Sequence, residues 1–168
     1  MAAIDRILIA YDDSDSSQRL LDYVARLAGG RDDLGFCLFH LLAGPPPEFR
    51  EHLGAEDPQQ ERRLAEKIQQ RARAWIREHR PEVEQMLERA RGELIEHGTP
   101  AAAIRLRIEP DFGERKLAEA CLEAAEQEGC ATIAVGRDHS PHFADWLTGH
   151  TSSALVRKAE GMAVWVVQ

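Results

Sequence analysis

The chain has 168 residues, of which 43% are hydrophobic and 30% charged, and its formal net charge at pH 7 is -8. This length predicts one domain with a substantial core, and the acidic balance argues against non-specific binding of DNA or RNA, which requires a basic surface. No apolar segment approaches the roughly 20 residues that span a bilayer, and the N-terminal apolar run is too short for a signal peptide.

The cysteines Cys37, Cys121 and Cys130 form no C-x-x-C pair. This pattern favours a reduced chain over a disulfide scaffold or a zinc ribbon. Together with the absence of an apolar leader, it leads us to expect a cytoplasmic protein with neither a membrane nor a nucleic-acid partner.

The first predicted elements are a strand, a helix and a strand. Arg6–Tyr11 is a continuous apolar run, typical of a strand buried on both faces in a parallel sheet. The Asp- and Ser-rich residues that follow predict a helix N-cap. The helix, about Ser16–Ala28, ends at a Gly-Gly pair and is expected to bury one face made of Leu20, Leu21, Val24, Leu27 and Ala28. A second apolar strand is predicted at Phe36–Leu42.

Residues 44–98 form a long, variable connection. Gly44 and three prolines begin a loop, and Asp57-Pro58 is typical of a helix N-cap followed by proline at the first helical position. The helical pattern spans Pro58–Glu96, and Pro81 predicts a kink or two helices end to end. We interpret its many Arg, Glu and Gln residues as a solvated face with i,i+4 pairs, with docking onto a partner protein as the alternative.

The remaining elements alternate in the same way. Ile104–Ile108 alternates with arginine, which predicts a strand at a sheet edge. The pattern then predicts a turn at Glu109–Gly113, a helix at Glu114–Gln127 ending at Gly129, a strand at Ala131–Val135, a helix from Gly149 to about Lys158, and a final strand at Val164–Val167.

This order of elements predicts the fold class: a Rossmann-like, doubly wound, open α/β sheet of five mainly parallel strands with helices on both faces, in a single domain over residues 1–168. Ligands of such sheets bind beyond the carboxyl ends of the strands, where the strand order reverses. The loops Asp12–Ser17 and Gly136–Ser152 both follow apolar strands, and we expect them to face each other across one crevice.

Three segments together resemble the universal stress protein family. They are ILIAYDDSDSS near the N-terminus, EGCATIAVGRDH around the fourth strand, and GHTSSALVRKAEGMAVWVVQ at the end. The resemblance covers almost the whole chain, with residues 44–98 matching only as a long helical connection. Each motif is weak alone, and their order and spacing make the combination fairly specific.

The resemblance implies an adenine-nucleotide site. ATP-binding members carry Gly-x2-Gly-x9-Gly followed by Ser or Thr, and Gly136 and Gly149 match its first and third glycines. His139 stands at the second glycine and His150 at the first hydroxyl, while Ser152 falls on a later hydroxyl position. In the first loop and the second strand, the resemblance assigns Asp12 to the nucleoside, Ser14 to the loop hydroxyl and Leu41 to the backbone that meets adenine.

The sequence does not decide how His139 and His150 affect nucleotide binding. At position 139 the backbone has to approach phosphate closely, so the imidazole could block the path or donate a hydrogen bond to an anion. His150 keeps its backbone N–H for an anion but lacks the short hydroxyl. Asp13 replaces a glycine common in the family and adds negative charge near the phosphates.

The predicted function is therefore that of a stress-response regulator which binds ATP, with Mg²⁺, and has no enzymatic activity beyond slow ATP hydrolysis. The resemblance also implies a homodimer through Val164, Trp165, Val166 and Val167. One alternative is a dimer of the same fold that binds an unknown protein partner without nucleotide. Another is a metal-responsive sensor built on His139 and His142.

Overall fold

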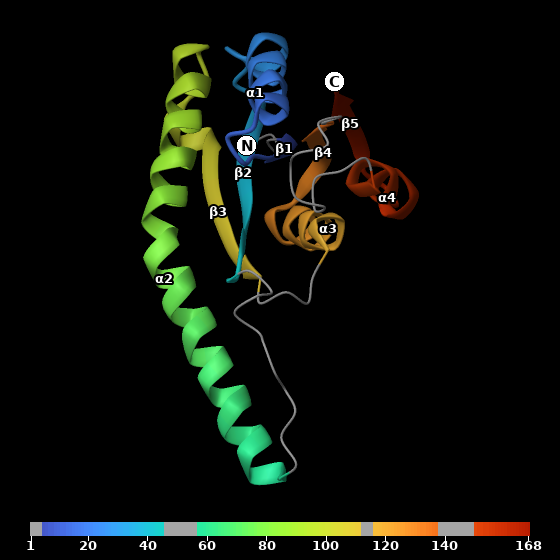
Figure 1. Ribbon diagram of the computed structural model, residues 1–168. Coiled ribbons are helices and arrows are strands. Elements are labelled where there is room, and N and C mark those ends of the chain that lie inside the picture. Colours follow the sequence, from blue (N-terminus) through green and yellow to red (C-terminus); the bar gives the residue numbers. More distant parts are fainter. Residues whose placement is uncertain (1–4, 46–56, 112–115, 138–149) are drawn as a thin grey trace.

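A parallel sheet of five strands forms the centre of the molecule. The computed structural model describes residues 5–45, 57–111, 116–137 and 150–168 (Figure 1). The strands β1 (Asp5–Ala10), β2 (Leu34–Ala43), β3 (Ile104–Asp111), β4 (Cys130–Gly136) and β5 (Ala163–Val167) lie in the order β3-β2-β1-β4-β5. Every neighbouring pair is parallel, which confirms the predicted Rossmann-like fold class.

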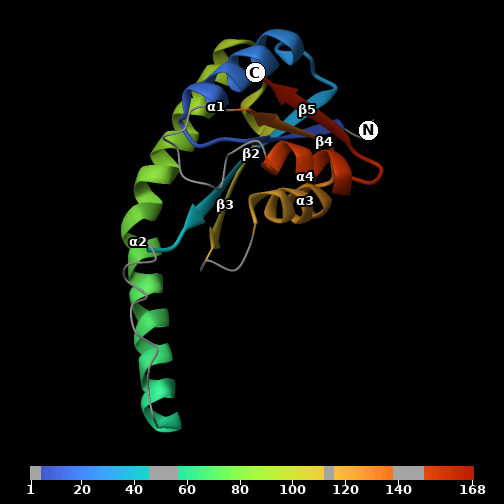
Figure 2. The same ribbon diagram turned by 45° about the vertical axis from the view of Figure 1, so that its right-hand side comes forward.

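Helices cover both faces of the sheet. One face packs against α1 (Asp15–Ala28) and α2 (Pro58–Glu96), and the other against α3 (Leu117–Glu128) and α4 (His150–Lys158), as Figure 2 shows. A short 3-10 helix, Ala101–Ala103, precedes β3. Successive residues of a strand pack against the helices on opposite faces of the sheet, because side chains alternate across a sheet. Leu8 thus packs toward α3 and Ile9 toward α1, and both are fully buried.

The strand β3 lies at an edge of the sheet, as its alternating pattern predicts. The expected turn at Glu109–Gly113 is wrong for its described part, because the strand continues to Asp111 and pairs with Leu42 and Ala43 of β2. Pro110 is tolerated there because an edge strand leaves one side of its backbone unpaired, where a missing N–H is not needed.

The first helix begins and ends as predicted to within one residue, with Ser14 as its N-cap and Gly29 as its C-cap. One core assignment is wrong, because Leu27 is 54% exposed. The other four expected members are buried, Ala28 among them at 2% exposure. Leu27 instead borders a hollow beside β5, together with Tyr23 and Trp165.

The long helix α2 is unbroken from Pro58 to Glu96, so the interpretation as two helices end to end is wrong. Pro81 removes one backbone donor, but the residues after it bury an apolar stripe that holds the chain helical against the sheet. The buried members of α2 are Ala72, Ile76, Val83, Met86, Leu87, Ala90 and Leu94. Among the described helices, none is both long and apolar enough to cross a membrane.

Candidate functional site

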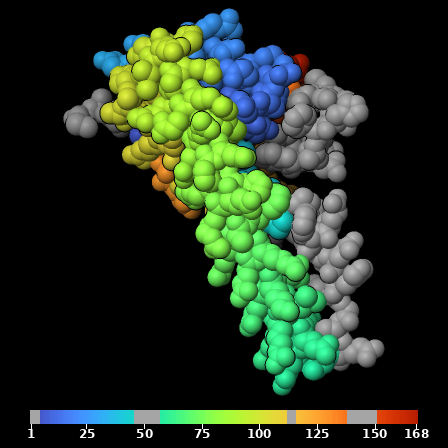
Figure 3. Space-filling model, turned by 60° about the vertical axis from the view of Figure 1, so that its left-hand side comes forward, coloured from blue at the N-terminus to red at the C-terminus, as the bar shows by residue number. Residues whose placement is uncertain are grey.

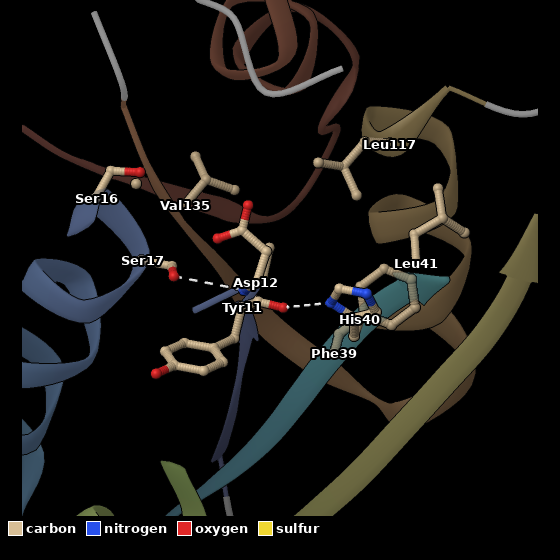
Figure 4. A pocket seen from close by; sticks show the side chains of 11 residues that line it. Tyr11, Asp12, Ser16, Ser17, Phe39, His40, Leu41, Leu117 and Val135 are labelled. Carbon is tan, nitrogen blue, oxygen red and sulfur yellow. Dashed lines mark hydrogen bonds between the residues drawn. The ribbon is translucent and has the colours of Figure 1, made fainter. Parts of the chain in front are cut away.

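A pocket lies where the strand order of the sheet reverses. From β1 the chain proceeds to β2 and β3 on one side, whereas β4 and β5 lie on the other side. The carboxyl ends of β1, β2 and β4 border a hollow of about 320 Å³ that includes space open to solvent. Its lining, shown in Figure 4, is Ala10, Tyr11, Asp12, Ser16, Ser17, Phe39, His40, Leu41, Leu117, Val135 and Gly136.

The loop between β1 and α1 is closed by its own hydrogen bonds. The Ser14 amide and hydroxyl both donate to Oδ1 of Asp12, at 3.2 and 2.6 Å. The Ser17 amide donates to Oγ of Ser14 at 3.2 Å, which is the N-cap bond of α1. Ser14 is therefore a buried capping residue and does not line the pocket.

Asp12 is held in place by this loop while it faces the pocket. Figure 4 shows its carboxylate between the serines of α1 and the side chains of Leu41 and Leu117. Within the described residues, no protein group donates to its second oxygen, Oδ2, whereas Oδ1 is used by Ser14. An oriented carboxylate oxygen of this kind can accept a hydrogen bond from a ligand hydroxyl.

Asp13 adopts a left-handed backbone conformation, with φ of 63°. Aspartate tolerates this region better than most residues, although glycine would adopt it without strain. Its carboxylate accepts a hydrogen bond from Tyr11 Oη at 3.2 Å and lies 3.3 Å from a guanidinium nitrogen of Arg89. Burial, and secondly the charge of Asp13, raise the pKa of Tyr11, so its hydroxyl stays protonated, and its single proton is shared between Asp13 and Oε1 of Gln18, which lies at 2.7 Å.

Gly136 is explained by close packing. A Cβ atom at this position would lie 2.6 Å from the carbonyl oxygen of Ser16, which is part of the backbone of α1. Real Cβ atoms do not approach backbone that closely. The glycine therefore lets the first turn of α1 contact the end of β4, and it keeps the serine side of the pocket against the sheet.

His40 also lines the pocket, although the sequence did not predict it as a site residue. Its Nδ1 lies 2.8 Å from the Tyr11 carbonyl oxygen, which can only accept, so Nδ1 carries the proton (Figure 4). Burial lowers the pKa of His40, so the ring is neutral at pH 7. The sequence feature that could have identified His40 is its position as a polar residue inside the apolar run FCLFHLL, next to Leu41.

The other walls are apolar. Leu41, Val135 and Leu117 come from β2, β4 and α3, and they face the same space as Asp12 in Figure 4. Leu117 opens α3 and carries no motif, so the sequence could not assign it. An apolar wall opposite one oriented carboxylate suits a flat ring that carries a hydroxylated substituent.

The structure brings together only part of the predicted site. Asp12, Leu41 and Gly136 line the pocket. Ser152 is buried on α4 and borders a separate hollow together with Arg137 and Arg157. His150 begins α4, and its side chain lies outside the described residues, as do His139, His142 and Gly149. Within the described part of the chain, no group of three or more His, Cys, Asp or Glu residues could hold a metal ion.

Comparison with known proteins agrees with this architecture. The model of the universal stress protein family matches residues 3–168. A universal stress protein family member from Burkholderia pseudomallei is 20% identical, with 98% of this chain and 96% of that chain covered and a TM-score of 0.59. No curated protein matches the sequence.

Two similar structures contain nucleotides. A universal stress protein in complex with cAMP is 17% identical, with 99% of this chain and 98% of that chain covered and a TM-score of 0.58. A universal stress protein from Archaeoglobus fulgidus in complex with dAMP is 14% identical, with both chains covered completely and a TM-score of 0.53. At these identities the likeness shows the fold.

Proposed function

The chain belongs to the universal stress protein family, and from that premise we propose that it is a stress-response regulator of one domain, residues 1–168, which binds an adenine nucleotide in the pocket at the switch point of the sheet. The observation that carries the proposal is the oriented carboxylate of Asp12 facing an apolar wall. The nucleotides bound by two structures of the same fold support the choice of ligand.

In the proposed complex, the adenine ring lies against Leu41, Leu117 and Val135, with Leu41 presenting its backbone to the ring. The Oδ2 atom of Asp12 accepts a hydrogen bond from the ribose. The phosphates then extend from Gly136 toward the start of α4, where backbone amides and the hydroxyl of Ser152 hold them. His139, Gly149 and His150 belong to this phosphate segment, and a bound ATP would bring Mg²⁺ with it.

The proposed role is binding and regulation. The pocket's described side chains include no nucleophile hydrogen-bonded to a general base, and the one carboxylate, of Asp12, is assigned to the ribose. Slow hydrolysis of bound ATP is the most that we assign to this arrangement. The three cysteines are free and buried, which supports a reducing, cytoplasmic location.

Calorimetric titration with AMP, cAMP and Mg-ATP tests the site. Asp12→Asn keeps the oxygen that accepts from Ser14 but removes the charge, so nucleotide affinity should fall by about tenfold, the equivalent of roughly 1.4 kcal/mol. Asp32→Asn, an exposed position at the other end of the sheet, is the matched control and should bind like the parent. Equal affinity of Asp12→Asn and the parent would overturn the assignment of Asp12.

A second candidate function is a dimer that binds a protein partner without nucleotide. It is favoured by the structural roles of predicted site residues: Ser14 caps α1, Gly136 admits α1 to the sheet, and Ser152 borders a different hollow. Absence of binding heat for all three nucleotides, with an intact dimer, would support this alternative against the first.

We propose that the dimer forms through β5. This strand is an edge of the sheet and pairs only with β4 among the described strands. Val166 is 36% exposed on it, and Val164, Trp165 and Val167 are partly buried. Tyr23 and Leu27 extend the apolar surface beside the strand. An exposed apolar edge of this kind is normally covered, and a second copy would cover it.

A further inference from the structure

One end of α2 extends beyond the other described elements. Figures 1, 2 and 3 show its N-terminal part projecting past the sheet and the other helices. The first buried residue of α2 is Ala72, and the side chains of residues 58–71 are exposed apart from Leu64 and Ile68, which are partly buried. At a rise of 1.5 Å per residue, this projection is roughly 21 Å long.

The N-terminal half of α2, which includes the projection, is basic although the protein is acidic. We call residues 58–80 the basic arm. It contains seven Arg and Lys residues and three Glu residues, which gives a formal charge of +4 in a chain whose total is -8. All seven basic side chains are exposed. Within the described part of the chain, Arg80 alone among them forms an ion pair, with Glu84 at 2.8 Å.

The other half of the same helix is acidic. Residues 81–96, which we call the acidic half, contain five Glu and two Arg residues, a formal charge of -3. The last turn holds no basic residue. A helix is stabilised by basic residues near its C-terminus, where the macrodipole is negative, whereas the C-terminal end of α2 holds Glu93 and Glu96. The segregation of charge therefore does not serve the stability of α2 itself.

We propose that α2 packs antiparallel against α2 of a second copy of this chain, across a two-fold axis near the middle of the helix. In that arrangement the basic arm of each copy lies along the acidic half of the other, so the contact is self-complementary. The charge distribution makes a second copy the fitting partner, because the required acidic surface is the same helix in reverse.

The exposed faces of the two halves are aligned for this contact. Arg73, Arg77, Glu84 and Glu88 occupy positions i, i+4, i+11 and i+15, which fall on one side of a helix with 3.6 residues per turn. All four side chains are exposed, and the buried residues of α2 lie on another side, against the sheet. Antiparallel alignment places Arg73 and Arg77 near Glu88 and Glu84 of the second copy.

The contact should be weak and sensitive to salt. Exposed ion pairs contribute little individually, and Glu84 and Glu88 already have partners on their own helix, Arg80 and Arg91. The association therefore depends on summed attraction between the two halves, which salt screens. It is separate from the proposed pairing through β5 and does not depend on it.

Charge reversal in the whole chain of 168 residues tests the contact. Every variant carries Val166→Lys, which prevents pairing through β5. The arm variant adds Arg63→Glu, Arg73→Glu and Arg77→Glu, and the acid variant adds Glu82→Lys, Glu84→Lys and Glu88→Lys. A matched control reverses three exposed arginines that lie outside α2: Arg19→Glu, Arg26→Glu and Arg31→Glu. Circular dichroism checks that each variant is folded.

Self-association is measured by sedimentation velocity at about 0.01 M and about 1 M salt. The Debye length is roughly 30 Å at the lower and 3 Å at the higher concentration. We expect the Val166→Lys protein and the control to self-associate at low salt, with affinity falling at least about tenfold at high salt. Each α2 variant alone should be monomeric, and an equal mixture of the two should associate again.

Two results would overturn the proposal. One is a Val166→Lys protein that stays monomeric at low salt and at high protein concentration. The other is a mixture of the arm and acid variants that does not associate. If the protein stays monomeric, binding of single-stranded RNA should be measured as well. Binding that the arm variant loses and the acid variant keeps would show that the basic arm binds a nucleic acid and not a second copy.

Discussion

At the scale of single residues, the pocket is built by close contacts between backbone segments. Gly136 at the end of β4 touches the Ser16 carbonyl group in the first turn of α1, where a Cβ atom would have no room. Ser16 and Ser17 line the pocket from that turn. The glycine therefore fixes the distance between the serine side of the pocket and the sheet, whether or not a phosphate lies beside it.

Replacement of Gly136 by alanine should destabilise the protein. The added methyl group meets backbone atoms on a packed helix, which cannot move aside without shifting α1, and such overpacking costs about 1–3 kcal/mol. The midpoint of urea unfolding should fall accordingly. Gly92→Ala in α2 is the control, because no atom lies within 4 Å of the added group, and it should stabilise by roughly 0.5–1 kcal/mol. An unchanged midpoint for Gly136→Ala would contradict the close contact.

His40 should make the stability depend on pH. Burial lowers its pKa in the folded protein below the unfolded value of about 6.5. The unfolded chain then takes up a proton first as the pH falls, so this contribution to stability is full above pH ~6.5 and is lost toward the folded pKa. Urea midpoints at about pH 7.5 and pH 5.5 measure the loss.

The comparison variant is His40→Gln, which removes the titrating group. Its midpoint should change less between the two pH values than that of the parent. His97→Gln removes an exposed histidine and should leave the pH dependence as it is. If His40→Gln and the parent lose equal stability on acidification, the burial of a neutral His40 is not the cause.

At the scale of elements, local signals in the sequence predicted the order and type of the helices and strands. Apolar runs and capping residues are local, which is why α1 begins and ends within one residue of its expected bounds. The errors arise where distant contacts decide. Pro81 stays within a helix because the residues after it are buried against the sheet, and β3 reaches Asp111 because β2 continues beside it.

The edge strand β5 is predicted to form the dimer interface. Val166→Lys places a charge on the exposed edge and should convert a dimer into monomers of 18.8 kDa, as measured by sedimentation at about 0.15 M salt, where the α2 contact is screened. Glu126→Lys on an exposed position of α3 is the control and should remain dimeric. A dimer that persists in Val166→Lys would place the interface elsewhere.

At the scale of the whole molecule, the pocket depends on segments that are distant in sequence. The sequence predicted the location, because strand order and apolar runs imply where the carboxyl ends of strands meet. It predicted Asp12, Leu41 and Gly136 as members through the family resemblance. It could not predict His40 and Leu117, because neither belongs to a motif and only the assembled fold brings them beside Asp12.

The most direct test of nucleotide binding is the melting temperature of the purified protein with and without millimolar Mg-ATP, after a check for nucleotide carried through purification. A ligand at about 100 times its dissociation constant adds roughly 2.7 kcal/mol to stability, which shifts the melting temperature by several degrees. We expect this rise, or bound adenine nucleotide in the purified protein, and a smaller rise in Asp12→Asn. No shift with Mg-ATP, AMP or cAMP, and no bound nucleotide, would contradict it.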